Sequence, residues 1–233
     1  MPLTLSKAEE SDVGAIADIH LASFGGNMML QAQFPTPALR AGLRISLMDK
    51  AREEIRDPQW AVLVIRDDNE IISFAKWKRP VLDASYAEVP WRWPEGTRMD
   101  ILNEWTKKVD DACSRVIGDT PCYCLSFIGT NPKYGGRGAA SMLISWGLER
   151  SEIENVPIQL ESTLVAWPLY KKLGFENKER IQMQLEGVGE NGQSVLYEEL
   201  SLVRWPVVPS AIESRATEVP KTEVPKTEVP KTD

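Results

Sequence analysis

The sequence has one histidine and three cysteines among 233 residues, and this scarcity excludes several kinds of site. A metal centre or proton relay that needs several histidines cannot be built from His20 alone. The spacing of Cys122 and Cys124 fits neither a zinc knuckle nor a thioredoxin-type pair. We therefore expect these two residues and Cys113 to be buried, reduced thiols, and we predict no metal site.

Basic charge and long apolar runs are also in short supply. The 27 Lys and Arg are outnumbered by 34 Asp and Glu, which gives a net charge of -7. Proteins that grip nucleic acids or anionic membranes need clustered basic residues, so we expect neither partner here. No run reaches the roughly 20 apolar residues of a membrane helix, and the N-terminus lacks a signal-peptide pattern. We expect a cytoplasmic protein, monomeric or homodimeric, that acts on a small molecule.

Hydrophobic periodicity predicts alternating strands and helices along most of the chain. The predicted strands are 2–7, 60–66, 71–78, 122–130, 156–163, 180–185 and 195–203. The predicted helices begin near residues 11, 37, 101, 139 and 167, and an irregular loop spans 81–96. Helices and strands that alternate in the centre, with hairpins toward the ends, predict an α/β sandwich around a mixed sheet.

The C-terminal segment differs from everything before it. The unit TEVPK occurs three times between Thr217 and Lys231. Each unit carries a proline and two opposite charges but only one valine to bury, so it cannot offset the entropy lost on ordering. We predict one folded domain over residues 1–208 and a disordered tail over 209–233.

The stretch NPKYGGRGAASML, residues 131–143, places three glycines between a predicted strand and a predicted helix. Free N–H groups and the macrodipole at a helix N-terminus attract phosphate, and glycines let the backbone approach it. A Walker loop would require a Gly-Lys pair, and a dinucleotide fold would require G-x-G-x-x-G. Neither pattern is present, which leaves the pyrophosphate arm of coenzyme A as the third option.

NPKYGGRGAASMLISWG resembles the acyl-CoA signature of the GNAT superfamily of N-acetyltransferases. The downstream block LESTLVAWPLYKKLGFE is similar to the second motif of that family, and the order and spacing of the two motifs agree. The resemblance covers about residues 3–205 and is strongest to a fungal branch of small acetyltransferases. It implies the GNAT fold, a mixed sheet of about seven strands flanked by helices and splayed where acyl-CoA binds, with acetyl-CoA as the co-substrate.

The resemblance also implies which residues hold acetyl-CoA. Backbone groups of the splayed strand would bind the pantetheine and the thioester oxygen, and the glycine turn would bind the pyrophosphate. These residues are Ile128, Gly129 and Thr130 on the strand, and Gly135, Gly136, Arg137, Gly138, Ala139, Ala140 and Ser141 at the turn. Gly135 stands where the family carries Gln or Arg, so one side-chain contact to the phosphates is missing.

Acetyl transfer needs a proton acceptor for the amine and a proton donor for the leaving thiolate. The family's acid, the tyrosine of the second motif, falls on Tyr170, whose ordinary pKa near 10 suits a thiolate leaving group. The family often places a glutamate base on the strand before the turn, but residues 121–132 contain no carboxylate. Glu161 on the next strand is the best substitute, and His20 on the first helix is a second candidate base.

The weak signal for a base favours an acceptor of low basicity or deprotonation through a water. Five tryptophans lie in segments that could line an acceptor cleft, which suits an aromatic or apolar molecule; they are Trp60, Trp77, Trp91, Trp93 and Trp167. The favoured hypothesis is direct acetyl transfer, in a ternary complex, to an amine or hydroxyl of a small molecule. The alternatives are a protein or peptide N-acetyltransferase and a catalytically weakened CoA-binding module.

Overall fold

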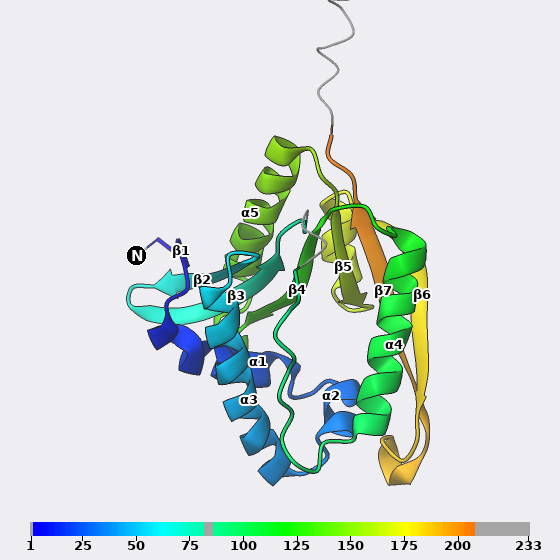
Figure 1. Ribbon diagram of the computed structural model, residues 1–233. Helices are drawn as coiled ribbons and strands as arrows, with labels where there is room; N and C mark the ends of the chain where they lie inside the picture. The colour runs from blue at the N-terminus through cyan, green and yellow to red at the C-terminus, as the bar shows by residue number, and fades with distance from the viewer. Residues whose placement is uncertain (1, 82–85, 208–233) are drawn as a thin grey trace, which may run out of the picture.

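The structure is a computed structural model that describes residues 2–81 and 86–207 (Figure 1). The tail predicted for residues 209–233 lies outside the described residues. The strands are β1 (Thr4–Lys7), β2 (Trp60–Asp67), β3 (Glu70–Lys78), β4 (Tyr123–Thr130), β5 (Ile158–Thr163), β6 (Glu176–Leu185) and β7 (Val195–Arg204). The α-helices are α1 (Val13–Phe24), α2 (Met28–Gln33), α3 (Pro37–Arg56), α4 (Met99–Val116), α5 (Ala139–Glu154) and α6 (Trp167–Lys172), and short 3₁₀ turns span Glu10–Asp12, Pro132–Tyr134 and Glu190–Gly192.

The seven strands form one mixed sheet, as the sequence predicts, and their order is β1-β2-β3-β4-β5-β7-β6. The β4–β5 pair is parallel and the other pairs are antiparallel. β4 and β5 pair at only two positions, Tyr123 with Ile158 and Cys124 with Gln159. The register between β3 and β4 shifts around Ser126, since Trp77 pairs with Leu125 while Lys76 pairs with Phe127. A bulge bends a strand, and here the bend accompanies the splay of β4 away from β5.

Two layers of helix cover the sheet. Helix α5 packs on the face that carries Leu63, Trp77 and Leu160, where the largest hydrophobic core lies. Gly147 allows this close approach, because a Cβ there would lie 2.3 Å from the Trp77 ring. Helices α1 and α3 cover the other face around β2 and β3, and α4 covers the same face over β6 and β7 (Figure 1).

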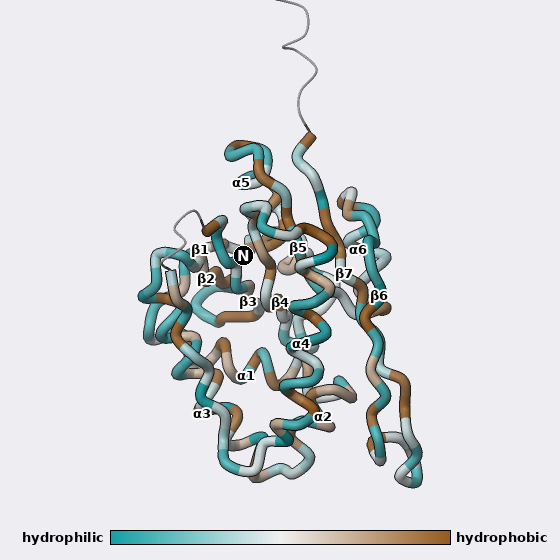
Figure 2. The backbone as a smooth tube through the Cα atoms, turned by 45° about the vertical axis from the view of Figure 1, so that its right-hand side comes forward, coloured by the Kyte–Doolittle hydropathy of each residue, from teal (hydrophilic) through white to brown (hydrophobic). Residues whose placement is uncertain are grey.

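Two features differ from the sequence prediction. Helix α2 was not predicted, because six residues are too short to show a helical period. Asn27 nonetheless caps it, accepting hydrogen bonds from the backbone N–H groups of Met29 and Leu30. Strand β6 begins at Glu176 instead of residue 180, because its first four residues are polar or exposed and show little alternation. In Figure 2 hydrophobic residues (brown) alternate with hydrophilic ones (teal) along the strands and helices.

Candidate functional site

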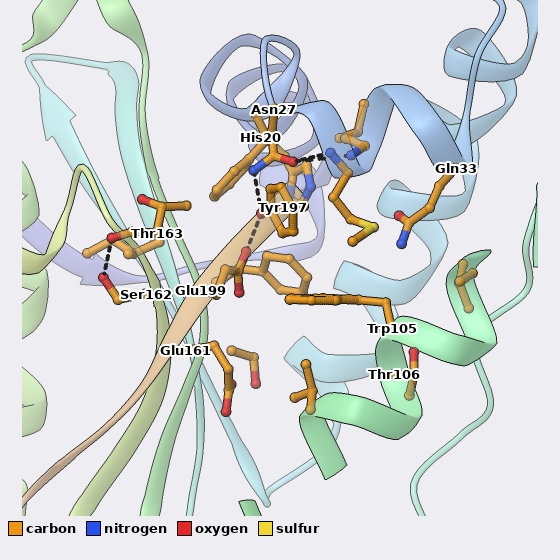
Figure 3. A pocket seen from close by; sticks show the side chains of 18 of the residues that line it. His20, Asn27, Gln33, Trp105, Thr106, Glu161, Ser162, Thr163, Tyr197 and Glu199 are labelled. Atoms are coloured by element: carbon orange, nitrogen blue, oxygen red, sulfur yellow. Dashed lines mark hydrogen bonds between the residues drawn. The ribbon is translucent and has the colours of Figure 1, made fainter. Parts of the chain in front are cut away.

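A cavity of about 730 Å³ lies where β4 and β5 separate. Its lining comes from both sides of the splay: α1, α2 and the segment with Trp91 and Trp93 on one side, and β5, β7, α4 and α6 on the other. Figure 3 shows the polar residues of this lining, with Trp105 and Thr106 on α4 facing the strands. Among the described residues that line the cavity there are two carboxylates and no Lys or Arg.

Glu161 lies on the cavity face of β5, where strand alternation also places Gln159. The Gln159 amide donates a hydrogen bond to Glu161 Oε1, and its own oxygen accepts one from the Cys124 thiol at 3.4 Å. Burial raises the pKa of Glu161 to about 7, with a smaller contribution from the neighbouring Glu199 and against the effect of the Gln159 bond. A carboxyl group with this pKa exchanges protons near neutral pH, as a general base must.

Glu199 on β7 is the second carboxylate of the lining, and the sequence analysis missed it. In the β5–β7 register Glu161 pairs with Ser201 and Thr163 pairs with Glu199. Glu199 therefore lies on the same face as Glu161, one diagonal step away. Tyr197 donates a hydrogen bond to Glu199 Oε1 and accepts one from the Asn27 amide at 2.8 Å. Burial raises the pKa of Glu199, and the Tyr197 bond opposes that effect.

Tyr170 enters the same cavity from α6, on the far face of the sheet, through the gap between the splayed strands. Its side chain is 5% exposed and packs edge-to-face against Phe175. Burial raises the pKa of Tyr170 to about 12. Within residues 2–81 and 86–207 its hydroxyl has no hydrogen-bond partner, so the proton is free to be donated to a ligand.

His20 also lines the cavity, but it lies among aromatic rings. Its ring centroid is 4.8 Å from Phe24 and 4.9 Å from Phe127, and the residue is 5% exposed. Burial, with a smaller contribution from the positive Lys76, lowers the pKa of His20 to about 3. The imidazole is therefore neutral at physiological pH and a weak proton acceptor, which makes Glu161 the better candidate for the base.

The glycine turn forms the N-terminus of α5, as predicted. Gly136 and Gly138 have φ of 74° and 84°, a conformation that favours glycine. The first helical bond runs from Met142 N–H to the Gly138 carbonyl. In the described part of the chain the six N–H groups from Gly136 to Ser141 have no acceptor. Six free donors at a helix N-terminus fit a pyrophosphate.

The charged side chain of the turn points elsewhere. Arg137 pairs with Asp67 in the β2–β3 turn at 2.6 Å and lies 5.7 Å from the Tyr134 ring centroid. Arg137 can therefore contribute only its backbone N–H to the predicted phosphate site of the turn. Gly135 has φ of -57°, and a Cβ there would meet only the Pro132 carbonyl oxygen at 3.5 Å. Backbone strain therefore does not explain the glycine, and the structure accepts a longer side chain there.

The strand residues assigned to acetyl-CoA occupy the end of β4 beside the splay. Ile128 lines the cavity. The Gly129 carbonyl accepts a hydrogen bond from Ser73 at 2.8 Å, and the Thr130 carbonyl accepts one from Ser23 at 2.9 Å. Beyond Cys124 this strand makes no pair with β5, so its edge there is available to a ligand. The roles of these residues stay predictions.

Only two of the five tryptophans that we expected in the cleft line the cavity. Trp91 and Trp93 line the cavity and stack on each other, with ring centroids 4.5 Å apart. Trp105 on α4 also lines it, although the sequence analysis did not single it out. The other three expected tryptophans do not line it; Trp77, for example, is fully buried beneath α5.

The part of the chain that the structure describes contains no group of three His, Cys, Asp or Glu placed to hold a metal ion. None of the helices within 2–81 and 86–207 is long and apolar enough to cross a bilayer.

A splayed mixed sheet, with a glycine turn at the N-terminus of α5, is the arrangement that the sequence resemblance implied. The family model of the GNAT acetyltransferase family matches residues 28–175, which is well over half of the chain. The protein therefore belongs to the GNAT family of acetyltransferases, and its co-substrate is acetyl-CoA.

One curated protein and three solved structures illustrate the relationship. A probable acyltransferase, SID5, of Ajellomyces capsulatus is 50% identical over 40 residues, which are 17% of this chain and 29% of that protein. The match thus spans less than a third of the curated relative. The PaiA N-acetyltransferase of Thermoplasma acidophilum, solved with coenzyme A, has a TM-score of 0.53 at 12% identity over 88% of this chain and 99% of that one.

The C-terminal condensation domain of Ebony, solved with β-alanyl-dopamine, has a TM-score of 0.65 at 13% identity and covers 88% of this chain and 99% of that one. A histone acetyltransferase HPA2-related protein of Corynebacterium glutamicum has a TM-score of 0.57 at 23% identity, over 90% and 99% of the two chains. At these identities the structural likeness shows the shared fold alone.

Proposed function

We propose that this acetyltransferase transfers the acetyl group to a primary amine of a small molecule with an aromatic or apolar body. The observation that carries the proposal is the cavity itself, which brings Glu161 and Tyr170 together between Trp91, Trp93 and Trp105. Aromatic walls bind a flat or apolar body, and a few polar groups orient it. Ebony, which shares the fold, was solved with β-alanyl-dopamine.

Glu161 and Tyr170 supply the proton transfers that this reaction needs. A primary amine is mostly an ammonium ion at pH 7, and Glu161 takes one proton to free the nitrogen lone pair. The nitrogen then bonds to the thioester carbonyl carbon. As the carbon–sulfur bond breaks, the Tyr170 hydroxyl gives its proton to the sulfur, and the nitrogen's excess proton goes to the phenolate. Glu161 returns its proton to solvent, which completes the cycle.

The experiment is a competition between acceptor classes. The full-length protein is incubated with acetyl-CoA and a mixed pool of alkyl amines, aryl amines, alcohols and peptides, and mass spectrometry identifies products that have gained one acetyl group. We expect acetylated amines. Acetylated peptides without acetylated small amines would indicate a protein N-acetyltransferase instead. Binding of CoA without any product would indicate a weakened CoA-binding module.

Tyr170→Phe tests the mechanism within the same assay. Removal of the hydroxyl should lower kcat by about 10²-fold or more without weakening acetyl-CoA binding, because the ring still packs against Phe175. Tyr134→Phe, at a partly buried position of the glycine turn and outside the cavity lining, is the matched control for losing a phenol. An unchanged kcat in Tyr170→Phe would remove this residue from the mechanism.

A further inference from the structure

Among the described residues that line the cavity, no cation neutralises its two carboxylates. Glu161 and Glu199 lie diagonally on neighbouring strands, and Asp110 on α4 adds negative charge near Glu161. No Lys or Arg occurs among the described residues that line the cavity, and His20 is neutral. Buried carboxylates without a cationic partner are costly to a fold.

The hydrogen bonds of Glu199 have a fixed direction. The Asn27 carbonyl oxygen accepts from the N–H groups of Met29 and Leu30, so its NH₂ group must be the end that donates to the Tyr197 oxygen. Tyr197 therefore turns its own proton toward Glu199 (Figure 3). The helix cap thus holds Glu199 Oε1 as an acceptor, which favours the ionised carboxylate. Glu199 Oε2 has no donor among the described residues.

Glu161 cannot keep an ammonium group bound as a cation throughout the reaction. In the proposed reaction it removes the positive charge of the reacting amine by taking a proton. Among the described residues no donor reaches Glu199 Oε2, so this oxygen can bind a cation that the reaction does not consume. Tyr170 shows independently that a ligand belongs in this cavity, because its 95% buried side chain has a hydroxyl without a partner in the described chain.

We propose that the acceptor is a diamine: one amino group is acetylated beside Glu161, and a second, unreacted ammonium group is bound by Glu199. This inference rests on the proposed function and specifies its substrate class. Diagonal residues on adjacent strands lie about 7–8 Å apart, and a short diamine can span a separation of this order. The tryptophans of the cavity fit a ring between the two amino groups.

The test compares 1,4-bis(aminomethyl)benzene with 4-methylbenzylamine, which has the same ring and one amino group replaced by hydrogen. We expect kcat/KM for the diamine to exceed that for the monoamine by tenfold or more, beyond the statistical factor of two for its two equivalent amines. Glu199→Gln should abolish most of this preference by lowering kcat/KM for the diamine about tenfold, while the value for the monoamine changes by less than about threefold.

Glu198→Gln is the matched control, because Glu198 is the neighbouring carboxylate on the opposite face of β7 and pairs with Arg180. It should keep the diamine preference. Thermal unfolding checks that each variant is folded. If Glu199→Gln does not fold, Tyr197→Phe replaces it, because it leaves the carboxylate in place and removes the donor that holds it. This variant should reduce the preference less than the loss of Glu199.

Equal turnover of the two amines by the wild type, or an equal loss of both in Glu199→Gln, would overturn the diamine inference and leave the amine acetyltransferase standing. Absence of acetylated product from every amine would instead overturn the proposed function. The two failures are therefore distinguishable in one set of assays.

Discussion

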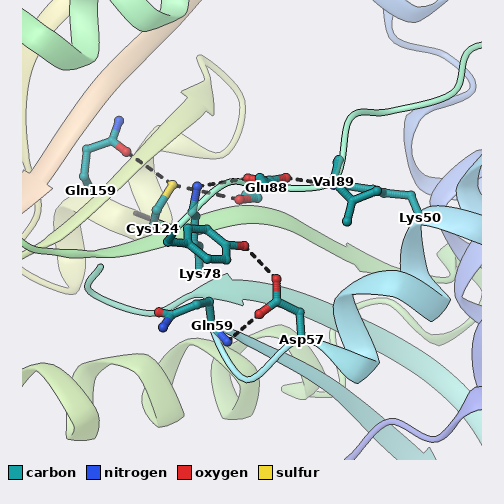
Figure 4. A network of polar contacts seen from close by, with 10 residues as sticks. Lys50, Asp57, Gln59, Lys78, Glu88, Val89, Cys124 and Gln159 are labelled. Carbon is teal, nitrogen blue, oxygen red and sulfur yellow. Dashed lines mark hydrogen bonds and ion pairs between the residues drawn. The ribbon is translucent and has the colours of Figure 1, made fainter. Parts of the chain in front are cut away.

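Charged side chains lie on both sides of the cavity, and the two sides differ in whether these charges are paired with opposite charges. Behind the aromatic wall of Trp91 and Phe127 lies a paired cluster, made of Lys50, Glu54, Lys76, Lys78 and Glu88 (Figure 4 shows its outer part). On the other side lies the acidic wall of Glu161 and Glu199, whose hydrogen bonds come from neutral side chains.

Every charge of the paired cluster has an opposite charge within contact. Lys76 Nζ is 2.6 Å from Glu54 Oε2, with side chains 1% and 3% exposed. Lys50 bonds both Glu88, at 2.8 Å, and the Val89 carbonyl, which fastens the segment leading to Trp91 onto α3. Burial raises the pKa of Glu88, but the hydrogen bonds from Lys50 and Lys78 outweigh it and leave that pKa lowered.

The difference in charge pairing suggests that the paired cluster serves stability and the acidic wall serves ligand binding. The charges that hold segments of the protein together are paired, whereas no Lys or Arg among the described residues lines the cavity beside the acidic wall. Perturbed carboxylates without a structural partner concentrate at functional sites. The comparison makes four predictions.

The largest expected effect is on catalysis at the acidic wall. Glu161→Gln keeps the size and the hydrogen-bonding shape but removes the proton acceptor, so kcat for an alkyl amine should fall about 10²–10⁴-fold. In the wild type, kcat/KM should rise with pH up to about 7, the pKa of Glu161, and this limb should disappear in the variant. CoA release measured from pH 5 to 9 checks both statements. A rate within threefold of wild type would contradict the role of Glu161.

Substitutions in the paired cluster should change the stability of the protein instead of its catalytic rate. Lys76→Met leaves Glu54 buried without its cation and should lower the free energy of unfolding by about 3–5 kcal/mol at pH 8. Adding Glu54→Leu should recover most of that loss, because a hydrophobic pair replaces the ion pair. Chemical denaturation of the single and double variants provides the measurement. A double variant no more stable than the single one would show that the two charges are not coupled.

The sequence analysis singled out Glu161 of the acidic wall but neither Glu199 nor any member of the paired cluster, and the reason is chain topology. Strand alternation was enough to place Gln159 and Glu161 on one face, and the downstream motif was enough to single out Tyr170. Glu199 and Tyr197 share a face in VLYEELSLV by the same rule, but only the sheet order places β7, rather than β6, beside β5. A hairpin read from sequence is compatible with either order.

The glycine turn was predicted most completely, because glycine residues indicate where the backbone takes a positive φ. The positive φ of Gly136 and Gly138 follows from the residue type. Charge pairs over long sequence separations give no such signal. Lys50 contacts Glu88 only because folding brings α3 beside the segment that precedes Trp91. Arg137 contacts Asp67 only because folding brings the glycine turn beside the β2–β3 turn.

Stability should also distinguish the two sides through its pH dependence. The folded pKa of Glu161, about 7, lies above its ordinary 4.5, so the folded state binds more protons between these values and stability falls as pH rises from about 4.5 to 7. Glu161→Gln removes that loss. The variant should gain stability over wild type across this window, by at most about 3 kcal/mol above pH 7. Thermal unfolding at pH 5 and 8 measures it, with Glu198→Gln as the control that should show no such gain.

The smallest effect belongs to the exposed edge of the paired cluster. Lys78 and Glu88 meet at 2.9 Å, but their side chains are 30% and 35% exposed, so solvent already screens the pair. Lys78→Gln should therefore cost less than about 1 kcal/mol, because Glu88 keeps its bond from Lys50. Denaturation beside Lys76→Met gives the contrast directly. If the two substitutions cost the same, burial would not govern these charges, and the uncompensated charge of the acidic wall would lose its significance as a mark of function.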